Sequence, residues 1–236
     1  MGTASPELPM LDHVAIHVPD RDAFAAQLVA RLDVHVIEKT DRFTLIGAHP
    51  DHGKLTLLDA VDGVDPSPTR IVSLVLAEAS ETSGSAPEVM PGGLVLTFAN
   101  VDDLGPEWSD TPHHALVAVA LRAEDPPLVA ASLEQQFGMH VGMVGPDHAV
   151  LEVGDRDGSG RLTFARESWS GDGRPSMLDH VGVRVPDALA QREAFTRAGV
   201  EVARWVDAEH SRAVFVEGPE GLLVEYVELT APLEAP

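Results

Sequence analysis

The sequence predicts an α+β fold of repeated βαβββ modules. Residues 177–229 alternate apolar and polar side chains in strand-like runs, with one helical run after the first of them. The run Leu-Asp-His-Val that opens this segment at Leu178 occurs again at Leu11, where the following residues also match. Repetition of this kind indicates duplicated supersecondary units.

The last module has the clearest pattern. Its helix is expected to end at Gly199, because glycine readily adopts the left-handed conformation that closes a helix. A turn rich in glycine and proline separates its last two strands. The expected elements are a strand at 178–185, a helix at 188–198 and strands at 200–206, 213–217 and 222–229.

Two further complete modules are expected, at 11–60 and at 112–167. In the third module, the run Pro-His-His-Ala that begins at Pro112 is interpreted as the start of the first strand. This alignment places His114 at the position that His180 occupies in the fourth module.

The segment 70–104 is less regular. It contains two strand-like runs separated by a loop rich in Ser, Glu, Pro and Gly. We interpret it as an eroded second module that has lost its helix; the alternative is a linker with two edge strands. The predicted domains are an N-terminal half, 1–111, and a C-terminal half, 112–236, which would hold the metal site.

Composition excludes several classes of site and partner. The 16 basic and 38 acidic residues give a net charge of −22, which repels nucleic-acid phosphates and anionic membranes. The chain has no cysteine for disulfides, thiolate nucleophiles or metal ligation. No apolar run approaches the roughly 20 residues of a membrane span, and residues 1–10 do not read as a signal peptide. We expect a cytoplasmic protein with a small-molecule substrate, and exposed strand edges in the eroded module favour a homodimer.

The repeated modules, the two Leu-Asp-His-Val runs and the Gly-Leu-Leu-Val-Glu-Tyr ending at 221–226 resemble the vicinal oxygen chelate superfamily. This superfamily includes glyoxalases, epimerases, drug-resistance proteins and extradiol dioxygenases. The resemblance covers nearly the whole chain and implies mixed, curved sheets that form a cup with the helices outside, but one scaffold carries many chemistries. The ligand pattern resembles the type I extradiol dioxygenases most closely. It implies an Fe(II)-dependent oxidoreductase that cleaves the ring of a catechol-like small molecule.

In those dioxygenases two histidines from first strands and one glutamate from a last strand hold the iron. The resemblance therefore implies His114, His180 and Glu225 as metal ligands. Such a set suits a divalent first-row metal and leaves positions open, so that Fe(II) is expected, with Mn, Ni, Co and Zn as alternatives. His13 is interpreted as a remnant, because Leu57 stands at the matching glutamate position; the alternative is that the metal site uses His13 instead.

Two more histidines are predicted to transfer protons, because histidine titrates near neutral pH. They are His210, just before a strand of the fourth module, and His148, at the analogous place in the third. Phe164 at the glutamate position of the third module leaves three protein ligands, and Phe215 stands where family dioxygenases carry a tyrosine. Two alternatives stay open: a metal-dependent isomerase or lyase of the glyoxalase or epimerase type, and a metal-free binding protein of the drug-resistance type.

Overall fold

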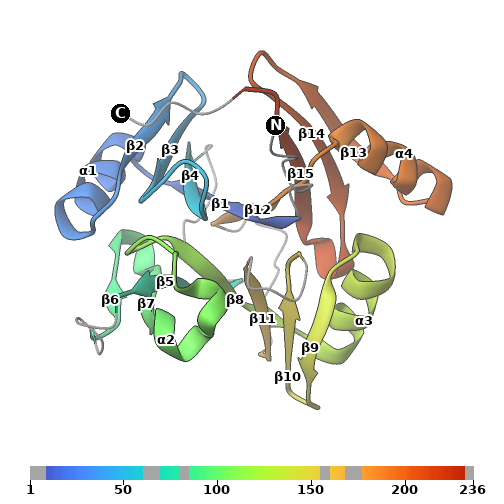
Figure 1. The fold of residues 1–236 in the computed structure, drawn as a ribbon, viewed down its shortest axis with the longest axis horizontal. Helices are drawn as coiled ribbons and strands as arrows, with labels where there is room; N and C mark the ends of the chain where they lie inside the picture. The colour runs from blue at the N-terminus through green and yellow to red at the C-terminus, as the bar shows by residue number, and fades with distance from the viewer. Residues whose placement is uncertain (1–8, 61–69, 80–84, 155–159, 168–176, 232–236) are drawn as a thin grey trace.

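The computed structural model describes residues 9–60, 70–79, 85–154, 160–167 and 177–231. The strands in this part of the chain form two curved sheets, one above the other in Figure 1. The first sheet takes the strands of the first and fourth modules, and the second sheet takes those of the second and third. The prediction of an α+β fold built from repeated modules is confirmed.

The first sheet has eight strands and bends into a U whose inner side we call the cup (Figure 1). Its two central strands, β1 and β12, are antiparallel, and each pairs in parallel with the last strand of its own module. In spatial order the strands are β13 (Val202–Asp207), β14 (Ser211–Glu217), β15 (Leu223–Leu229), β12 (Leu178–Arg184), β1 (Met10–Val18), β4 (Lys54–Asp59), β3 (Phe43–Gly47) and β2 (His35–Lys39).

The second sheet has seven strands and repeats this plan. Its central strands β5 and β8 are antiparallel and pair in parallel with β7 and β11. In spatial order the strands are β6 (Glu88–Val89), β7 (Val95–Asn100), β5 (Ile71–Glu78), β8 (Leu116–Ala123), β11 (Arg161–Arg166), β10 (His148–Glu152) and β9 (His140–Val144).

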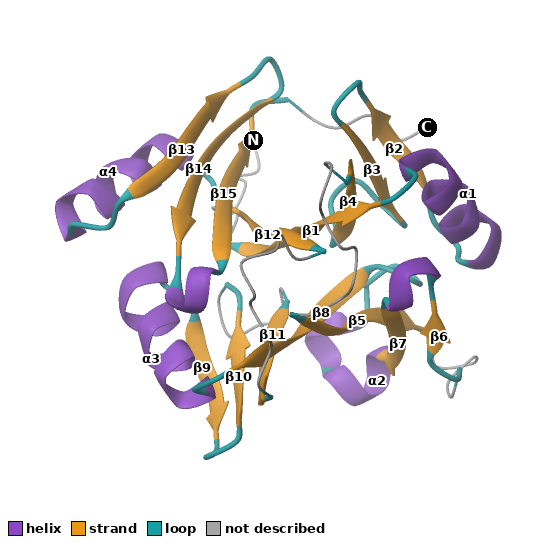
Figure 2. Ribbon diagram, turned by 180° about the vertical axis from the view of Figure 1, so that it is seen from behind, coloured by secondary structure: helices purple, strands orange, loops and turns teal. Residues whose placement is uncertain are grey.

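Three helices pack on the outer faces of the sheets, and Figure 2 shows α1 and α4 at opposite ends of the first sheet. Each helix begins after an aspartate whose side chain accepts a hydrogen bond from a backbone N–H of the first turn. The pairs of cap and helix are Asp20 with α1 (Arg21–Arg31), Asp125 with α3 (Pro126–Phe137) and Asp187 with α4 (Ala188–Ala198).

Aromatic side chains join the two sheets. Phe195 on α4 packs against Tyr226 on β15 and against Phe137 on α3, with ring centroids 5.0 and 5.9 Å apart. The buried Tyr226 hydroxyl donates a hydrogen bond to the Phe137 carbonyl at 2.7 Å. A buried hydroxyl needs such a partner, so this bond fixes α3 against the first sheet.

The second module has the parallel pairing of a complete module, β5 with β7, but no helix between β5 and β6 among the residues described there. Instead, α2 (Val101–Leu104) and a 3-10 turn at Pro106–Trp108 follow β7, and Trp108 packs against Ala77 and Val117. The interpretation as an eroded module agrees with this arrangement. Residues 80–84, which belong to the predicted loop of this module, lie outside the described residues, as do residues 61–69 and 168–176.

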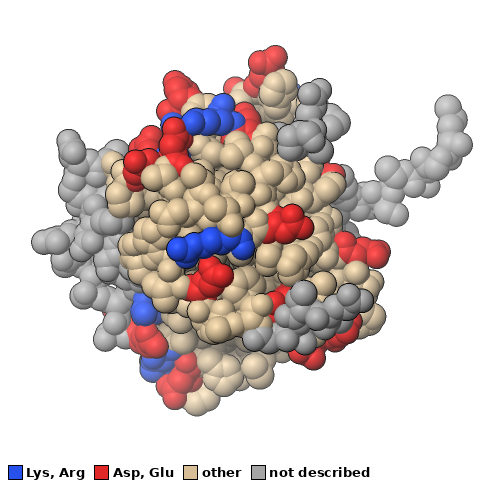
Figure 3. All heavy atoms as spheres, turned by 90° about the vertical axis from the view of Figure 1, so that its left-hand side faces the viewer, with Lys and Arg blue, Asp and Glu red and all other residues tan. Residues whose placement is uncertain are grey.

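The sheets do not follow the predicted halves, because each sheet takes one module from 1–111 and one from 112–236. As limits of folding units, these boundaries stay a prediction. None of the described helices is long and apolar enough to cross a membrane. On the face shown in Figure 3, acidic side chains are scattered with a few basic ones, and the described residues there form no continuous basic surface.

Gly53 lies where the two sheets meet. Its carbonyl accepts a hydrogen bond from the Leu116 N–H at 3.0 Å, and a Cβ on Gly53 would lie only 1.9 Å from the Leu116 carbonyl oxygen. We predict that Gly53→Ala lowers the free energy of unfolding by about 1–3 kcal/mol, because the two backbones must move apart. Chemical denaturation measures this, with Gly142→Ala as the control, since a Cβ there has its nearest neighbour at 3.5 Å. Equal losses of stability would contradict the close approach.

Candidate metal centre

Two bulged strands form the floor of the cup. Where β1 pairs with β12, the register shifts at Asp12 on one strand and at Asp179 on the other, so that each aspartate is an extra residue without an opposite partner. A bulge re-aims the side chains around it, whereas consecutive side chains of a regular strand point to opposite faces. Each aspartate can therefore lie beside the histidine that follows it, His13 or His180.

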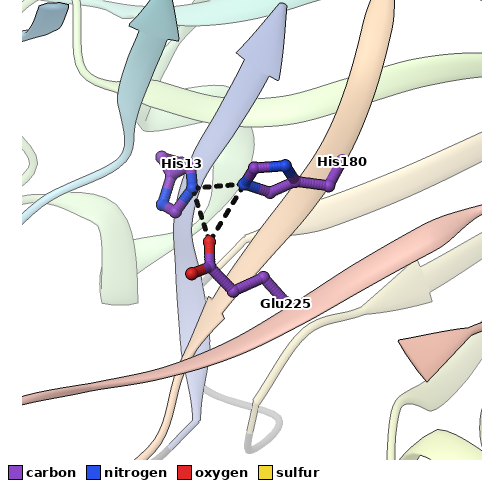
Figure 4. Close-up of side chains that lie close together, drawn as sticks. All are labelled: His13, His180 and Glu225. Carbon is purple, nitrogen blue, oxygen red and sulfur yellow. Dashed lines mark hydrogen bonds and ion pairs between the residues drawn. The ribbon is translucent and has the colours of Figure 1, made fainter. Parts of the chain in front are cut away.

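Three side chains converge on one point of this floor (Figure 4). The Nε2 atoms of His13 and His180 lie 3.0 Å apart, and each lies 3.0 Å from the same oxygen, Oε2 of Glu225. The side chains are 9%, 8% and 11% exposed, respectively. The cluster is thus almost buried, with a small part of each side chain open to solvent.

The two aspartates set the orientation of the imidazoles. Nδ1 of His13 lies 2.8 Å from the Asp12 carboxylate, and Nδ1 of His180 lies 2.9 Å from that of Asp179. A carboxylate only accepts, so each Nδ1 carries the proton and donates it. Each Nε2 then directs a lone pair toward the other ring and toward Glu225, which is the orientation found in metal-ligating histidines.

Asp12 belongs to a buried network of charges. One of its oxygens accepts from His13, and the other accepts from Lys54 at 2.8 Å and from Arg184 at 2.7 Å. Burial alone would raise the pKa of Asp12, but Lys54, His13 and Arg184 together hold it far below its usual range. The Pro50 carbonyl accepts from both Lys54 and Arg184 as well. Asp12 therefore stays ionised and holds its histidine firmly.

Asp179 has a different partner. Its second oxygen lies 3.4 Å from Nε2 of His17, which stands in the first module where Arg184 stands in the fourth. Burial raises the pKa of Asp179, but the hydrogen bonds from His17 and His180 lower it below its usual range. Arg184, five positions after Asp179, contacts Asp12, and His17, five positions after Asp12, contacts Asp179. Each strand therefore helps to fix the aspartate that orients the histidine of the other strand.

The donor set fits a divalent metal. Burial lowers the pKa of His13, but hydrogen bonds to Asp12 and Glu225 outweigh it and raise the pKa to about 9, so a proton sits among the three atoms when no metal does. Burial likewise raises the pKa of Glu225, but His13 and His180 lower it to about 2. With metal–ligand bonds of about 2.1 Å, adjacent corners of an octahedron are about 3.0 Å apart. The three atoms therefore match one face of an octahedral site.

His114 does not join this cluster, which corrects the predicted set of ligands. It lies in a turn before β8, with φ of 64°, and its Nδ1 accepts a hydrogen bond from the Asp33 N–H at 2.7 Å. The reason is register, because the third module's first strand begins only at Leu116. The residue that matches His180 in this module is Ala118. His13, interpreted from sequence as a remnant, takes the place assigned to His114.

The second sheet keeps the bulges of the first without its ligands. The register between β5 and β8 shifts at the same two places as the register between β1 and β12. The two histidine positions hold Ser73 and Ala118, and the two aspartate positions hold Val72 and Val117. Only the pairing of the first and fourth modules therefore assembles a cluster of this kind in the described part of the chain.

Strand register also corrects the predicted glutamate positions. Glu225 pairs with Gly182, and the matching residue of the first module is Thr56, not Leu57, because Thr56 pairs with Ala15. The third module has a threonine as well, where Phe164 was expected. The residues at this position in the first, second and third modules are Thr56, Thr97 and Thr163.

The two predicted proton-transfer residues lie elsewhere. His148 begins β10 in the second sheet, and His210 is exposed between β13 and β14, next to Glu209. No contact joins either of them to His13, His180 or Glu225 in the described part of the chain. Their catalytic role stays a prediction. Sequence reasoning missed Asp12 and Asp179, although an aspartate directly before the histidine in both matching runs was a signal for them.

Solved structures provide the comparison. Glyoxalase I from Zea mays superposes with a TM-score of 0.67 at 16% identity, covering 93% of this chain and 92% of its own. A putative dioxygenase from Bacillus subtilis superposes with a TM-score of 0.70 at 12% identity, covering 95% and 87%. The chain therefore shares its fold with these two proteins, as the resemblance found in the sequence implied. No family model and no curated protein sequence matches the chain.

The corrected ligand set can be tested directly with two single-residue variants. We predict that His13→Ala lowers the affinity for a divalent metal at least about 100-fold, because even partners that only orient a ligand contribute 10–100-fold. His114→Ala is the matched control and should bind metal like the wild type. Titration of the metal-free proteins with Mn(II) or Fe(II) measures both. If His114→Ala loses metal binding and His13→Ala keeps it, the ligand set expected from the sequence, with His114 in place of His13, is the right one.

Gly182 gives a second test without removing a ligand. A Cβ on Gly182 would lie 2.3 Å from Cε1 of His13, so the ring can hold its position only against a glycine. We predict that Gly182→Ala displaces the His13 ring and lowers metal affinity about 10-fold or more. The control is Ala15→Gly, at the matching position of β1. If Gly182→Ala binds metal as tightly as the wild type, the ring does not contribute to the site.

Proposed function

We propose that this protein is a metal-dependent enzyme whose centre binds a small molecule through two neighbouring oxygen atoms, and that it cleaves a catechol-like ring with dioxygen using Fe(II). The observation that carries the proposal is the cluster of three candidate ligand side chains in the described part of the chain, His13, His180 and Glu225, with Thr56 at the matching carboxylate position of the first module. Two imidazoles and one carboxylate leave positions for a bidentate substrate and for dioxygen. When bound, the metal supplies Lewis-acid activation and a template for the substrate.

The side chains around the cluster support a substrate with an apolar body. Phe215 packs edge-on against the His180 ring with centroids 5.2 Å apart, and with Ala213 and Val227 it forms an apolar cluster next to Glu225. Apolar walls keep water away from the open side of the ligands and strengthen electrostatic interactions there. The aspartate contacts of both histidines hold a proton on each Nδ1 and leave Nε2 as the atom that would bind the metal.

A metal-dependent isomerase or lyase is the second candidate. The structural likeness to glyoxalase I from Zea mays favours it. Such a reaction needs a base beside the substrate, and Thr56 cannot provide one where a second carboxylate would stand. We therefore rank this candidate below the dioxygenase.

The experiment compares the two reactions on one protein. Wild-type protein loaded with Fe(II) under anaerobic conditions is mixed with a panel of catechols, and dioxygen consumption is recorded. Protein loaded with Mn(II), Ni(II) or Zn(II) is assayed with hemithioacetals of α-ketoaldehydes. The proposal is supported if the wild type consumes dioxygen, the His13→Ala variant does not, and the His114→Ala variant still does. Activity only in the second assay would favour the isomerase, and a wild type that binds no metal would favour a metal-free binding protein.

Thr56 allows a sharper test of the three-ligand claim. By the register of the two modules, Thr56→Glu places a fourth ligand, a second carboxylate, at the centre. We predict that this variant retains the metal but loses dioxygen consumption about 10-fold or more, because the new ligand takes a position that substrate or dioxygen needs. Thr163→Glu makes the same change at the matching position of the second sheet and should leave the activity intact. Full activity of Thr56→Glu would contradict the need for the open position.

A further inference from the structure

An arginine lies on the wall of the cup in the same row as the metal centre. Arg204 on β13 pairs with Phe215 on β14, and Phe215 pairs with Glu225 on β15. Directly paired residues of antiparallel strands point to the same face, so all three side chains are on the cup side. Two steps of about 4.8 Å between strands put the Arg204 backbone roughly 10 Å from that of Glu225. Figure 1 shows β13 and β14 as one wall of the U, with α4 on its outer side.

The Phe215 ring connects Arg204 to the ligands. Its guanidinium carbon lies 3.7 Å from the centre of the Phe215 ring, and that ring contacts the edge of His180 with centroids 5.2 Å apart. Phe215 is buried, whereas Arg204 is exposed. A guanidinium placed over a ring by a cation–π contact still has its N–H donors for a carboxylate, whose geometry matches their planar fork.

The charge of Arg204 has no acidic partner within the described part of the chain, at the 4.0 Å limit of an ion pair. Arg212, at the other end of the same hairpin, contacts both Asp207 and Glu228.

We propose that Arg204 binds a carboxylate of the substrate, which would make the substrate a small acid that carries its two metal-binding oxygens at the other end. A single aromatic ring with the carboxylate opposite the two oxygens, or an aliphatic acid of similar length, has this arrangement. The inference rests on the proposed metal-dependent function and adds the anionic substrate class to it. A bidentate arginine–carboxylate pair gives orientation as well as affinity, so the acid would enter with its two oxygens toward the metal.

The test uses two probes that differ only in the carboxylate, catechol and 3,4-dihydroxybenzoate, titrated anaerobically into metal-loaded protein by calorimetry. The wild type is expected to bind the acid at least about 10-fold more tightly, the range of a charge-assisted hydrogen bond. Arg204→Met should lower the affinity for the acid to that for catechol, and Arg204→Lys should keep part of the preference for the acid. Arg212→Met, on the same hairpin, is the control and should keep all of it.

The outcomes separate this inference from the function on which it rests. Equal affinities for the two probes in metal-loaded wild type, or a preference that survives in Arg204→Met, would overturn the role of Arg204 and leave the metal centre standing. A wild type that takes up no metal would overturn the proposed function, and the inference with it. Metal content of every variant is measured first, so that a change in probe binding is read only at equal metal loading.

Discussion

The antiparallel pairing of β1 with β12 is the constraint on which the site depends. It brings together two histidines that are 167 residues apart in sequence, and the parallel partner of β12 adds Glu225. Neither terminal module contains the cluster alone. The two chain ends must therefore meet before any ligand set exists, and pairing over such a separation has a high entropic cost that the packing of both sheets must offset.

The comparison of the two sheets shows what the metal centre requires of the fold. Both sheets have the same pair of bulges, but the second fills the bulge positions with Val72 and Val117 and has no buried ion network there. In the first sheet Asp12 and Lys54 are almost completely buried as ions. A buried ion pair rarely stabilises a fold more than apolar side chains of similar size. Its presence only beside the ligands is understandable if Asp12 holds His13 for a metal.

Local patterns in the sequence were sufficient for most of the fold. The apolar periodicity and a closing glycine predicted the helix at Ala188–Ala198, which is confirmed with those bounds. His180 and Glu225 were also identified, because the two positions break the apolar pattern of a strongly repeated module. These signals are local, and each depends on side chains a few residues apart.

The pairing of modules is not a local property, and there the sequence was insufficient. Periodicity cannot tell which modules share a sheet, so the third module was taken as the partner of the fourth. The run Pro-His-His-Ala looked like a strand start, but the chain makes a turn at His114 before β8 begins. The closest match between repeats, Leu-Asp-His-Val at Leu11 and Leu178, was the better guide. The bulges at Asp12 and Asp179 place each aspartate beside the histidine that follows it, so both residues of each Asp-His pair contribute to the cluster.

The most direct measurement is an anomalous-difference map from a crystal of the protein grown with Mn(II) or Fe(II), recorded at the absorption edge of that metal. The account predicts one strong peak bonded to Nε2 of His13, Nε2 of His180 and one carboxylate oxygen of Glu225, at about 2.1 Å from each. A peak at His114, or no peak among these three side chains at full metal loading, would contradict it.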